Sequence, residues 1–217
     1  MRIFNGRGAE FDGVVATASK DGARVRVEQS RAAVSEARVA VTLAQAVLKG
    51  DKMDDVVRDA VMMGVAAIQP LVTARTEIAL AALERGHRRE RWQRIAVSSS
   101  KQCGRAVVPA VLEPCTFTDA IAALRDRASA ATSGRALPGL LCVEPTASAD
   151  VLSLADLEVE PPVAATIVVG PEGGWTAEEI SAGSEVCRLM TLGPRTLRAD
   201  AMALVALTAV YTRWREL

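Results

Sequence analysis

The chain has few aromatic side chains and a single histidine. Only 3% of its 217 residues are aromatic, so the core must consist mostly of Ala, Val and Leu. The histidine, His87, lies in an arginine-rich polar stretch. A Ser-His-Asp or Cys-His hydrolase site would depend on this residue alone, which argues against that class of enzyme.

Paired cysteines are also missing. Cys103, Cys115, Cys142 and Cys187 are widely spaced and form no CxxC pair. This spacing does not suit a zinc site, and a disulfide framework is not expected in a core of this size. We therefore expect small buried cysteines and no metal.

The sequence has neither an excess of charge nor a long apolar run. Its 26 basic and 26 acidic residues give a formal net charge of zero, so a nucleic-acid site would have to be local. No apolar run approaches the roughly 20 residues that span a bilayer. The start, MRIFNGRGAE, lacks the apolar core of a secretion signal. We expect a cytoplasmic protein without membrane contact.

Two kinds of pattern divide the chain. In residues 1 to about 30, Asn-Gly and Asp-Gly turns and alternating valines predict two or three antiparallel strands. From about residue 36, strands alternate with helices, which predicts an α/β domain with a mostly parallel sheet covered on both faces. The expected strands are 39–43, 65–68, 107–109, 140–143, 166–169 and 188–192. The expected helices include 53–61, 77–101, 117–128 and 199–214, with a loop through Ser133, Gly134 and Pro138. Trp92 is expected to pack against the fold rather than to stack on a base.

The stretch VVGPEGGWTAEEI, residues 168–180, reads as a strand, a glycine loop and a helix. Thr176 and Glu179 have the spacing of a capping box that opens a helix. Ligands of open α/β sheets bind beyond the carboxyl ends of the strands. The loop matches neither GxGxxG nor a P-loop, and Glu172 would repel a pyrophosphate. The loop is therefore either a structural turn or a site for a neutral or cationic ligand.

A second stretch, LGPRTLRADAMAL at 192–204, repeats this design of strand, Gly-Pro and helix. It adds Arg195, Arg198 and Asp200. A third strand ends at Glu144-Pro145. Proline and glycine leave backbone groups unpaired at these strand ends, free to bind a nucleobase edge. The three strand ends together predict one site.

The two stretches resemble the motif pair of the SPOUT-class RNA methyltransferases that methylate N3 of a uridine in 16S ribosomal RNA. KGDKMDDVV (49–57) and KQCGRAVVP (101–109) resemble two more blocks of that family, in the same order. The resemblance covers residues 36–217. It implies an enzyme that uses S-adenosylmethionine to methylate 16S RNA within the 30S subunit, a deep trefoil knot in the C-terminal sheet, and a homodimer. It also implies a methyltransferase domain at 34–217, preceded at 1–33 by a small, incomplete PUA-like β domain.

The resemblance assigns roles to residues. Arg198 is expected to stabilise the anion that forms when uridine N3 loses its proton, and Asp200 to accept that proton. Glu172 suits the sulfonium cation of the cofactor. Gln102, Arg105 and Arg195 are expected to bind RNA. The expected cofactor-binding residues are Glu144, Val169, Gly170, Glu172, Gly173, Gly174, Leu192, Gly193, Leu197 and Arg198.

Three positions depart from the family pattern, which has Glu where this chain has Met62, Lys101 and Asp200. These changes bear on proton transfer more than on cofactor binding. One alternative is a catalytically impaired relative that binds RNA or the ribosome and keeps the knot. A second is an unrelated nucleotide-binding α/β protein. Binding of S-adenosylmethionine, followed by an assay of methyl transfer, separates the three hypotheses.

Overall fold

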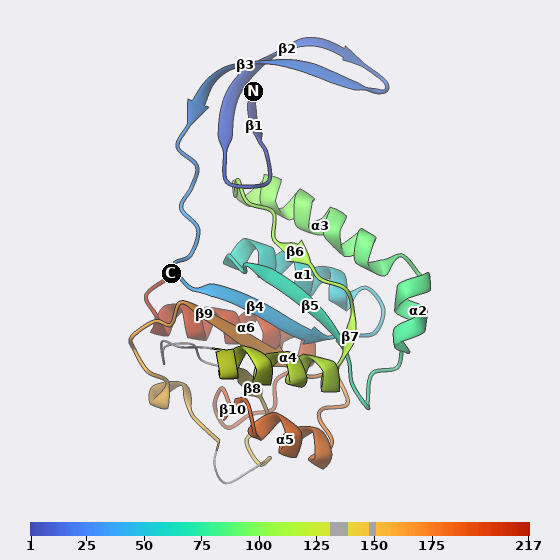
Figure 1. Cartoon of the computed structure of the whole chain (residues 1–217), viewed down its shortest axis with the longest axis vertical. Coiled ribbons are helices and arrows are strands. Elements are labelled where there is room, and N and C mark those ends of the chain that lie inside the picture. The colour runs from blue at the N-terminus through green and yellow to red at the C-terminus, as the bar shows by residue number, and fades with distance from the viewer. Residues whose placement is uncertain (131–138, 148–150) are drawn as a thin grey trace.

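The structure is a computed structural model that describes residues 1–130, 139–147 and 151–217. Two sheets are joined by the connection 32–39, which contains the expected boundary between residues 33 and 34 (Figure 1). The expected loop through Ser133, Gly134 and Pro138 lies outside the described residues. Within the described ranges, no helix has the length and apolar character needed to cross a bilayer.

The N-terminal sheet is antiparallel and largely exposed. Its strands pair in the order β1-β2-β3, which confirms the predicted antiparallel unit. They are β1 (Arg2–Phe4), β2 (Glu10–Ser19) and β3 (Gly22–Arg31). The loop between β1 and β2 touches the rest of the chain, because Gly8 N donates to Ala106 O and Val108 N donates to Gly6 O, each at 3.0 Å. The hairpin of β2 and β3 extends away from the remaining fold (Figure 1).

The second sheet is parallel, as predicted, with the strand order β10-β8-β9-β4-β5-β6 and with β7 also pairing with β5. Its strands are β4 (Ala40–Ala46), β5 (Ala67–Val72), β6 (Ala110–Val111), β7 (Cys115–Thr116), β8 (Leu140–Cys142), β9 (Ala164–Val169) and β10 (Arg188–Met190). The strand expected at 65–68 is β5, which runs through Pro70 to Val72 instead of ending before this proline. Proline removes only one ladder donor, and β5 stays paired with β4 as far as Leu71. The strand expected at 107–109 begins instead at Ala110.

Helices cover both faces of the parallel sheet, as expected (Figure 1). The sheet separates two core clusters. In the central strand β4, Leu43 belongs to one cluster and Ala44 belongs to the other. α1 (Lys52–Met63), α3 (Arg88–Cys103) and α6 (Ala199–Arg213) build the first cluster, and α4 (Phe117–Ala130) packs with α5 (Ala177–Ser184) over the second. α2 (Leu80–Arg85) packs on α3, and a short 3-10 turn (Leu154–Asp156) contacts α6.

The polar segment at 77–101 forms two helices where one was predicted. α2 ends at Arg85 and α3 begins at Arg88, with His87 in the left-handed region at φ 49°. The break allows α3 to pack on α1. Trp92 is 2% exposed and its Nε1 donates to Asp54 Oδ1 at 3.1 Å, which confirms its predicted packing role.

The parallel arrangement sets the position of the site. Because the strands run in one direction, the carboxyl ends of β8, β9 and β10 lie at one edge of the sheet. The ends of β4 and β5 lie at the same edge. Five connections that are distant in sequence therefore meet there.

Candidate functional site

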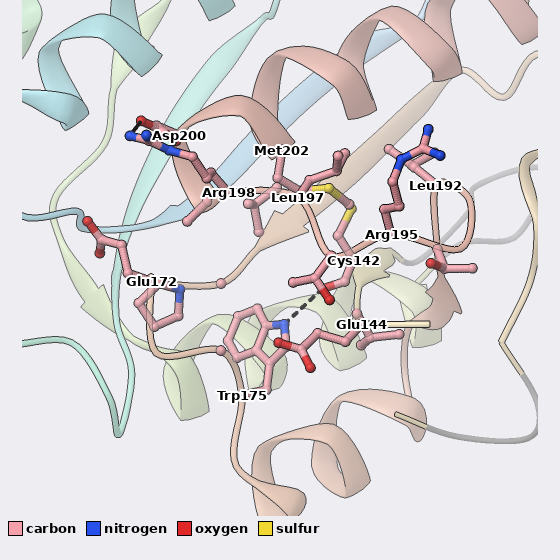
Figure 2. Close-up of a pocket in the computed structure, with 18 of the residues that line it drawn as sticks. Cys142, Glu144, Glu172, Trp175, Leu192, Arg195, Leu197, Arg198, Asp200 and Met202 are labelled. Atoms are coloured by element: carbon pink, nitrogen blue, oxygen red, sulfur yellow. Dashed lines mark hydrogen bonds and ion pairs between the residues drawn. The ribbon is translucent and has the colours of Figure 1, made fainter. Parts of the chain in front are cut away.

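A pocket of about 370 Å³ lies beyond the carboxyl ends of β8, β9 and β10 (Figure 2). Its walls come from Cys142–Pro145, from the glycine loop (residues 170–176, after β9) and from the second loop (residues 191–198, after β10), with the first turn of α6. Lys52, the first residue of α1, also lines it. The three strand ends predicted to form one site thus do meet.

Most of the expected site residues line this pocket. Of the expected cofactor-binding residues, only Gly173 and Gly193 are not among its lining residues, while Arg195, Arg198 and Asp200 are. Gly173 lies against Arg75 instead, and a Cβ added to it would be 3.1 Å from the Cβ of Arg75. Gly193 has a φ of +92°, a left-handed conformation that glycine adopts without strain. Gly193 therefore allows the backbone of the second loop to turn at this position.

Trp175 joins the glycine loop to β8. Its Nε1 donates to the carbonyl of Cys142 at 2.9 Å, and its ring centroid lies 5.0 Å from that of Phe117. A Cβ added to Gly170 would lie 2.9 Å from Cε2 of this indole, so the close approach requires glycine. Trp175 was not predicted as a site residue, although it is an aromatic residue beside a double glycine in a chain with few aromatics.

The helix that follows the glycine loop begins as predicted. Glu179 N donates to Thr176 Oγ1 at 3.2 Å, and Thr176 N donates to Glu179 Oε2 at 2.9 Å, which confirms the capping box. The other oxygen of Glu179 accepts a hydrogen bond from Ala74 N at 2.8 Å. The start of α5 is therefore bonded to the connection that follows β5.

Four charged side chains of alternating sign line one part of the pocket. Lys52 Nζ lies 2.9 Å from Glu172 Oε1, and Arg198 Nη2 lies 2.7 Å from Asp200 Oδ2. Figure 2 shows Arg198 and Asp200 side by side, with Glu172 on the same side of the pocket and Arg195 on the opposite side, beside Leu192. Lys52 was not predicted as a site residue, because its partner lies 120 positions away in the sequence.

Both carboxylates of this group ionise readily. Burial acts to raise the pKa of Glu172, but hydrogen bonds from Lys52 and from backbone N–H groups outweigh it and hold the pKa below its usual value. The hydrogen bond from Arg198 likewise lowers the pKa of Asp200, and the same contact raises the pKa of Arg198. A carboxylate bound in this way is a weak proton acceptor. Asp200 gains basicity only when Arg198 moves to another partner.

Glu144 and Cys142 also line the pocket, but they are not part of these two ion pairs. Glu144 is exposed to the pocket, and its carboxylate has no hydrogen bond or ion pair with any residue in the described ranges. It is therefore the freer of the two glutamates to meet a cation, since Glu172 is offset by Lys52. Burial raises the pKa of Cys142 to about 12, so its thiol is protonated at neutral pH and is not a nucleophile.

The expected RNA-binding residues do not lie together, and Arg105 has to be corrected. Arg195 lines the pocket and Gln102 is exposed on α3, but Arg105 is only 7% exposed. Its guanidinium group pairs with Glu36 and donates to Val61 O at 2.8 Å and to Val65 O at 3.0 Å. These internal partners occupy its donors, so Arg105 stabilises the junction of α1 and β5 rather than presenting a charge to RNA. Nothing local in the sequence indicates these partners.

A metal centre is not indicated by the described side chains. In residues 1–130, 139–147 and 151–217, no three His, Cys, Asp or Glu residues gather in a way that could hold a metal ion.

Residues 35–211 match the RNA methyltransferase domain family, and the chain belongs to this family. It is 32% identical over 177 residues to ribosomal RNA small subunit methyltransferase E of Synechocystis sp., a match that covers 81% of this chain and 54% of the relative. It is 27% identical over 178 residues to the Bacillus subtilis protein of the same name, covering 81% of this chain and 66% of the relative. The chain thus spans between about half and two thirds of the length of these two curated relatives.

Solved structures with a bound ligand have the same fold. Ribosomal RNA small subunit methyltransferase E from Neisseria gonorrhoeae, bound to S-adenosyl methionine, is 29% identical with a TM-score of 0.83, covering 99% of this chain and 83% of that one. A Legionella pneumophila protein in complex with the same cofactor is 29% identical with a TM-score of 0.82, covering 97% of this chain and 81% of that one.

Proposed function

We propose that this chain is an S-adenosylmethionine-dependent methyltransferase that methylates N3 of a specific uridine in 16S ribosomal RNA of the small subunit. One observation carries the proposal: both Gly-Pro loops of the sequence form a single pocket inside the segment that matches the RNA methyltransferase family. The names of the relatives as small subunit ribosomal RNA methyltransferases, and the S-adenosyl methionine bound by the Neisseria gonorrhoeae protein, support methyl transfer to this RNA.

The pocket residues fit the cofactor. Its volume of about 370 Å³ is within the range of small-molecule sites. Leu192, Leu197 and Met202 offer apolar contact to an adenine ring (Figure 2). The carboxylate of Glu144, which has no hydrogen bond or ion pair with any described residue, suits the cationic methionine portion. When bound, the cofactor supplies an electrophilic methyl group on a sulfonium.

Arg198 and Asp200 are proposed to act together on the uridine. The side chain of Arg198 is 75% exposed, so it can leave Asp200 and donate to a uracil oxygen, where it stabilises the negative charge that develops as N3 is deprotonated. Loss of the Arg198 contact raises the pKa of Asp200, which can then take the N3 proton. The exchange of partners would couple substrate binding to proton removal.

The finer features of assembly belong to the same proposal. We propose the trefoil knot in the region of β8–β10 and α6, supported by the position of β8 between β10 and β9. A homodimer is supported by exposed apolar side chains on α6, Leu204 at 37% and Val205 at 40%. The N-terminal sheet is proposed to be part of a PUA-like domain that binds RNA together with Gln102 and Arg195. The substrate would be the 30S subunit in the cytoplasm.

Titration calorimetry and a transfer assay test this function. We expect the chain to bind S-adenosylmethionine, and to methylate 30S subunits from a strain that lacks the modification, with mass spectrometry locating the methyl group in the 16S RNA. Binding without transfer would indicate the catalytically impaired relative. Binding of other nucleotides but not of S-adenosylmethionine would overturn the proposal.

A further inference from the structure

Two carbonyl groups of the glycine loop accept hydrogen bonds from side chains elsewhere in the fold, one in a strand and one in a connection. Gln45, in β4, donates from Nε2 to Gly170 O at 3.4 Å and to Ala46 O at 2.9 Å. Arg75, in the connection after β5, donates from Nη1 to Gly173 O at 2.7 Å. The loop is thus bonded at two of its three glycines to residues from the N-terminal half of the chain.

Gln45 is not explained by the stability of the fold. It lies in the central strand and is 0% exposed, yet its Oε1 has no hydrogen-bond partner among the described residues. A buried acceptor without a partner destabilises the folded state, and an apolar side chain of similar size would avoid that cost. The contact of Gln45 that reaches beyond its own strand is the one that its amide N–H group makes to the glycine loop.

Arg75 holds the same loop from the other side. Its own backbone lies in a turn closed by the hydrogen bond from Thr73 N to Thr76 Oγ1 at 3.1 Å. Its side chain is exposed, and its partner Gly173 is absent from the pocket lining. Arg75 therefore bonds the loop at a residue that does not itself line the pocket.

We propose that Gln45 and Arg75 are positioning residues that hold the glycine loop in its ligand-binding shape. A loop containing Gly170, Gly173 and Gly174 has great conformational freedom when it is unrestrained. Bonds to the Gly170 and Gly173 carbonyl groups restrict this freedom before the ligand arrives, which removes an ordering cost from binding. The identity of the ligand rests on the proposed function, whereas the restraint of the loop does not.

Hydrogen–deuterium exchange of the ligand-free protein tests the restraint directly. Gln45→Met and Arg75→Met should each speed amide exchange in residues 170–176 by about 10-fold. Gln69→Met is a matched control, because Gln69 Nε2 donates to Pro70 O at 3.1 Å and to Glu113 O at 2.6 Å, away from the glycine loop. The control should leave exchange in 170–176 unchanged. The melting temperature of Gln45→Met should be no lower than that of the wild type, since the orphaned oxygen is removed.

Ligand binding gives the second readout. The dissociation constant and KM for S-adenosylmethionine should rise about 10-fold in both variants while kcat stays near the wild-type value. Arg75→Lys should restore part of the affinity, because it keeps a cationic donor. Unchanged exchange in 170–176 in both variants would overturn the proposal, as would a loss of melting temperature in Gln45→Met without faster exchange in the loop. Failure of the wild type to bind S-adenosylmethionine would reject the proposed function, while the exchange data would still decide the restraint.

Discussion

The glycine loop and the second loop, which face each other across the pocket, are held in different ways. The glycine loop is bonded to Gln45, Lys52 and Arg75, all from the N-terminal half of the chain. Within the described part of the chain, the side-chain hydrogen bonds of the second loop stay local, from Thr191 to Gly193 and from Arg198 to Asp200. One wall is therefore set when the protein folds, and the other can adjust when the substrate arrives. This difference suits the proposed roles, in which the glycine loop holds the cofactor and Arg198 exchanges Asp200 for the uridine.

The largest expected effect is on the mobile side. Arg198→Ala should reduce methyl transfer by about 10²–10³-fold, as when a charge-stabilising donor is removed. Cofactor affinity should stay within about 3-fold of the wild type, because the glycine loop is untouched. Single-turnover kinetics and calorimetry measure the two effects separately. Equal losses in both would place Arg198 on the cofactor and would break the comparison between the loops.

A change on the fixed side should act on binding. Gly170→Val places side-chain atoms against the Trp175 indole, which is 2.9 Å from even a Cβ at this position. We expect about 10–100-fold weaker binding of S-adenosylmethionine and a loss of about 1–3 kcal/mol in the free energy of unfolding, as for an overpacked core. Gly13→Val is the matched control, because an added Cβ there lies 2.8 Å from Cγ1 of Val25, in the N-terminal sheet and outside the pocket. If calorimetry shows that the control weakens S-adenosylmethionine binding as much as Gly170→Val does, the contact with the indole does not explain the loss of affinity.

Acid should loosen the fixed loop by a smaller amount. The pKa of Glu172 is lowered from 4.5 in the folded state, so its ion pair with Lys52 stabilises the loop fully above pH 4.5 and is lost as the pH falls through the lowered pKa. The pair is partly exposed, which limits the effect to about 1 kcal/mol. Chemical denaturation from pH 7 to pH 3 should show this loss, and Glu172→Gln should remove that part of the pH dependence. An identical pH profile in the variant would exclude Glu172 as the source.

The smallest effect is expected at the exposed residue of the second loop. Arg195→Ala should weaken RNA binding only a few-fold. It should also reduce the slope of log K against log salt concentration by about one, as for the loss of a single phosphate contact. Filter binding to 16S RNA fragments at several salt concentrations measures both quantities. Cofactor affinity serves as the internal control, and a cofactor effect larger than the RNA effect would assign Arg195 to the other ligand.

Parts of the site that depend on neighbouring residues could be predicted from the sequence. The capping box of Thr176 and Glu179 spans three positions, and the Gly-Pro loops follow directly from their strands. Strand alternation predicted the parallel sheet, and the parallel sheet brings the strand ends together. The break at His87 was missed because a polar segment continues on both sides of it, although Gly86 marked the place.

Contacts between distant residues were decided only by the tertiary structure. The charge of Lys52 reaches Glu172 because β4 pairs with β9, a neighbour relation that the order along the chain does not reveal. The burial of Arg105 could not be predicted for the same reason, because its partners Glu36, Val61 and Val65 lie at least 40 residues away in the sequence. Sequence by itself determined which loops could bind a ligand, because backbone freedom and helix capping are local properties. Strand order decided which charges face those loops and how firmly each loop is held, because those are properties of packing.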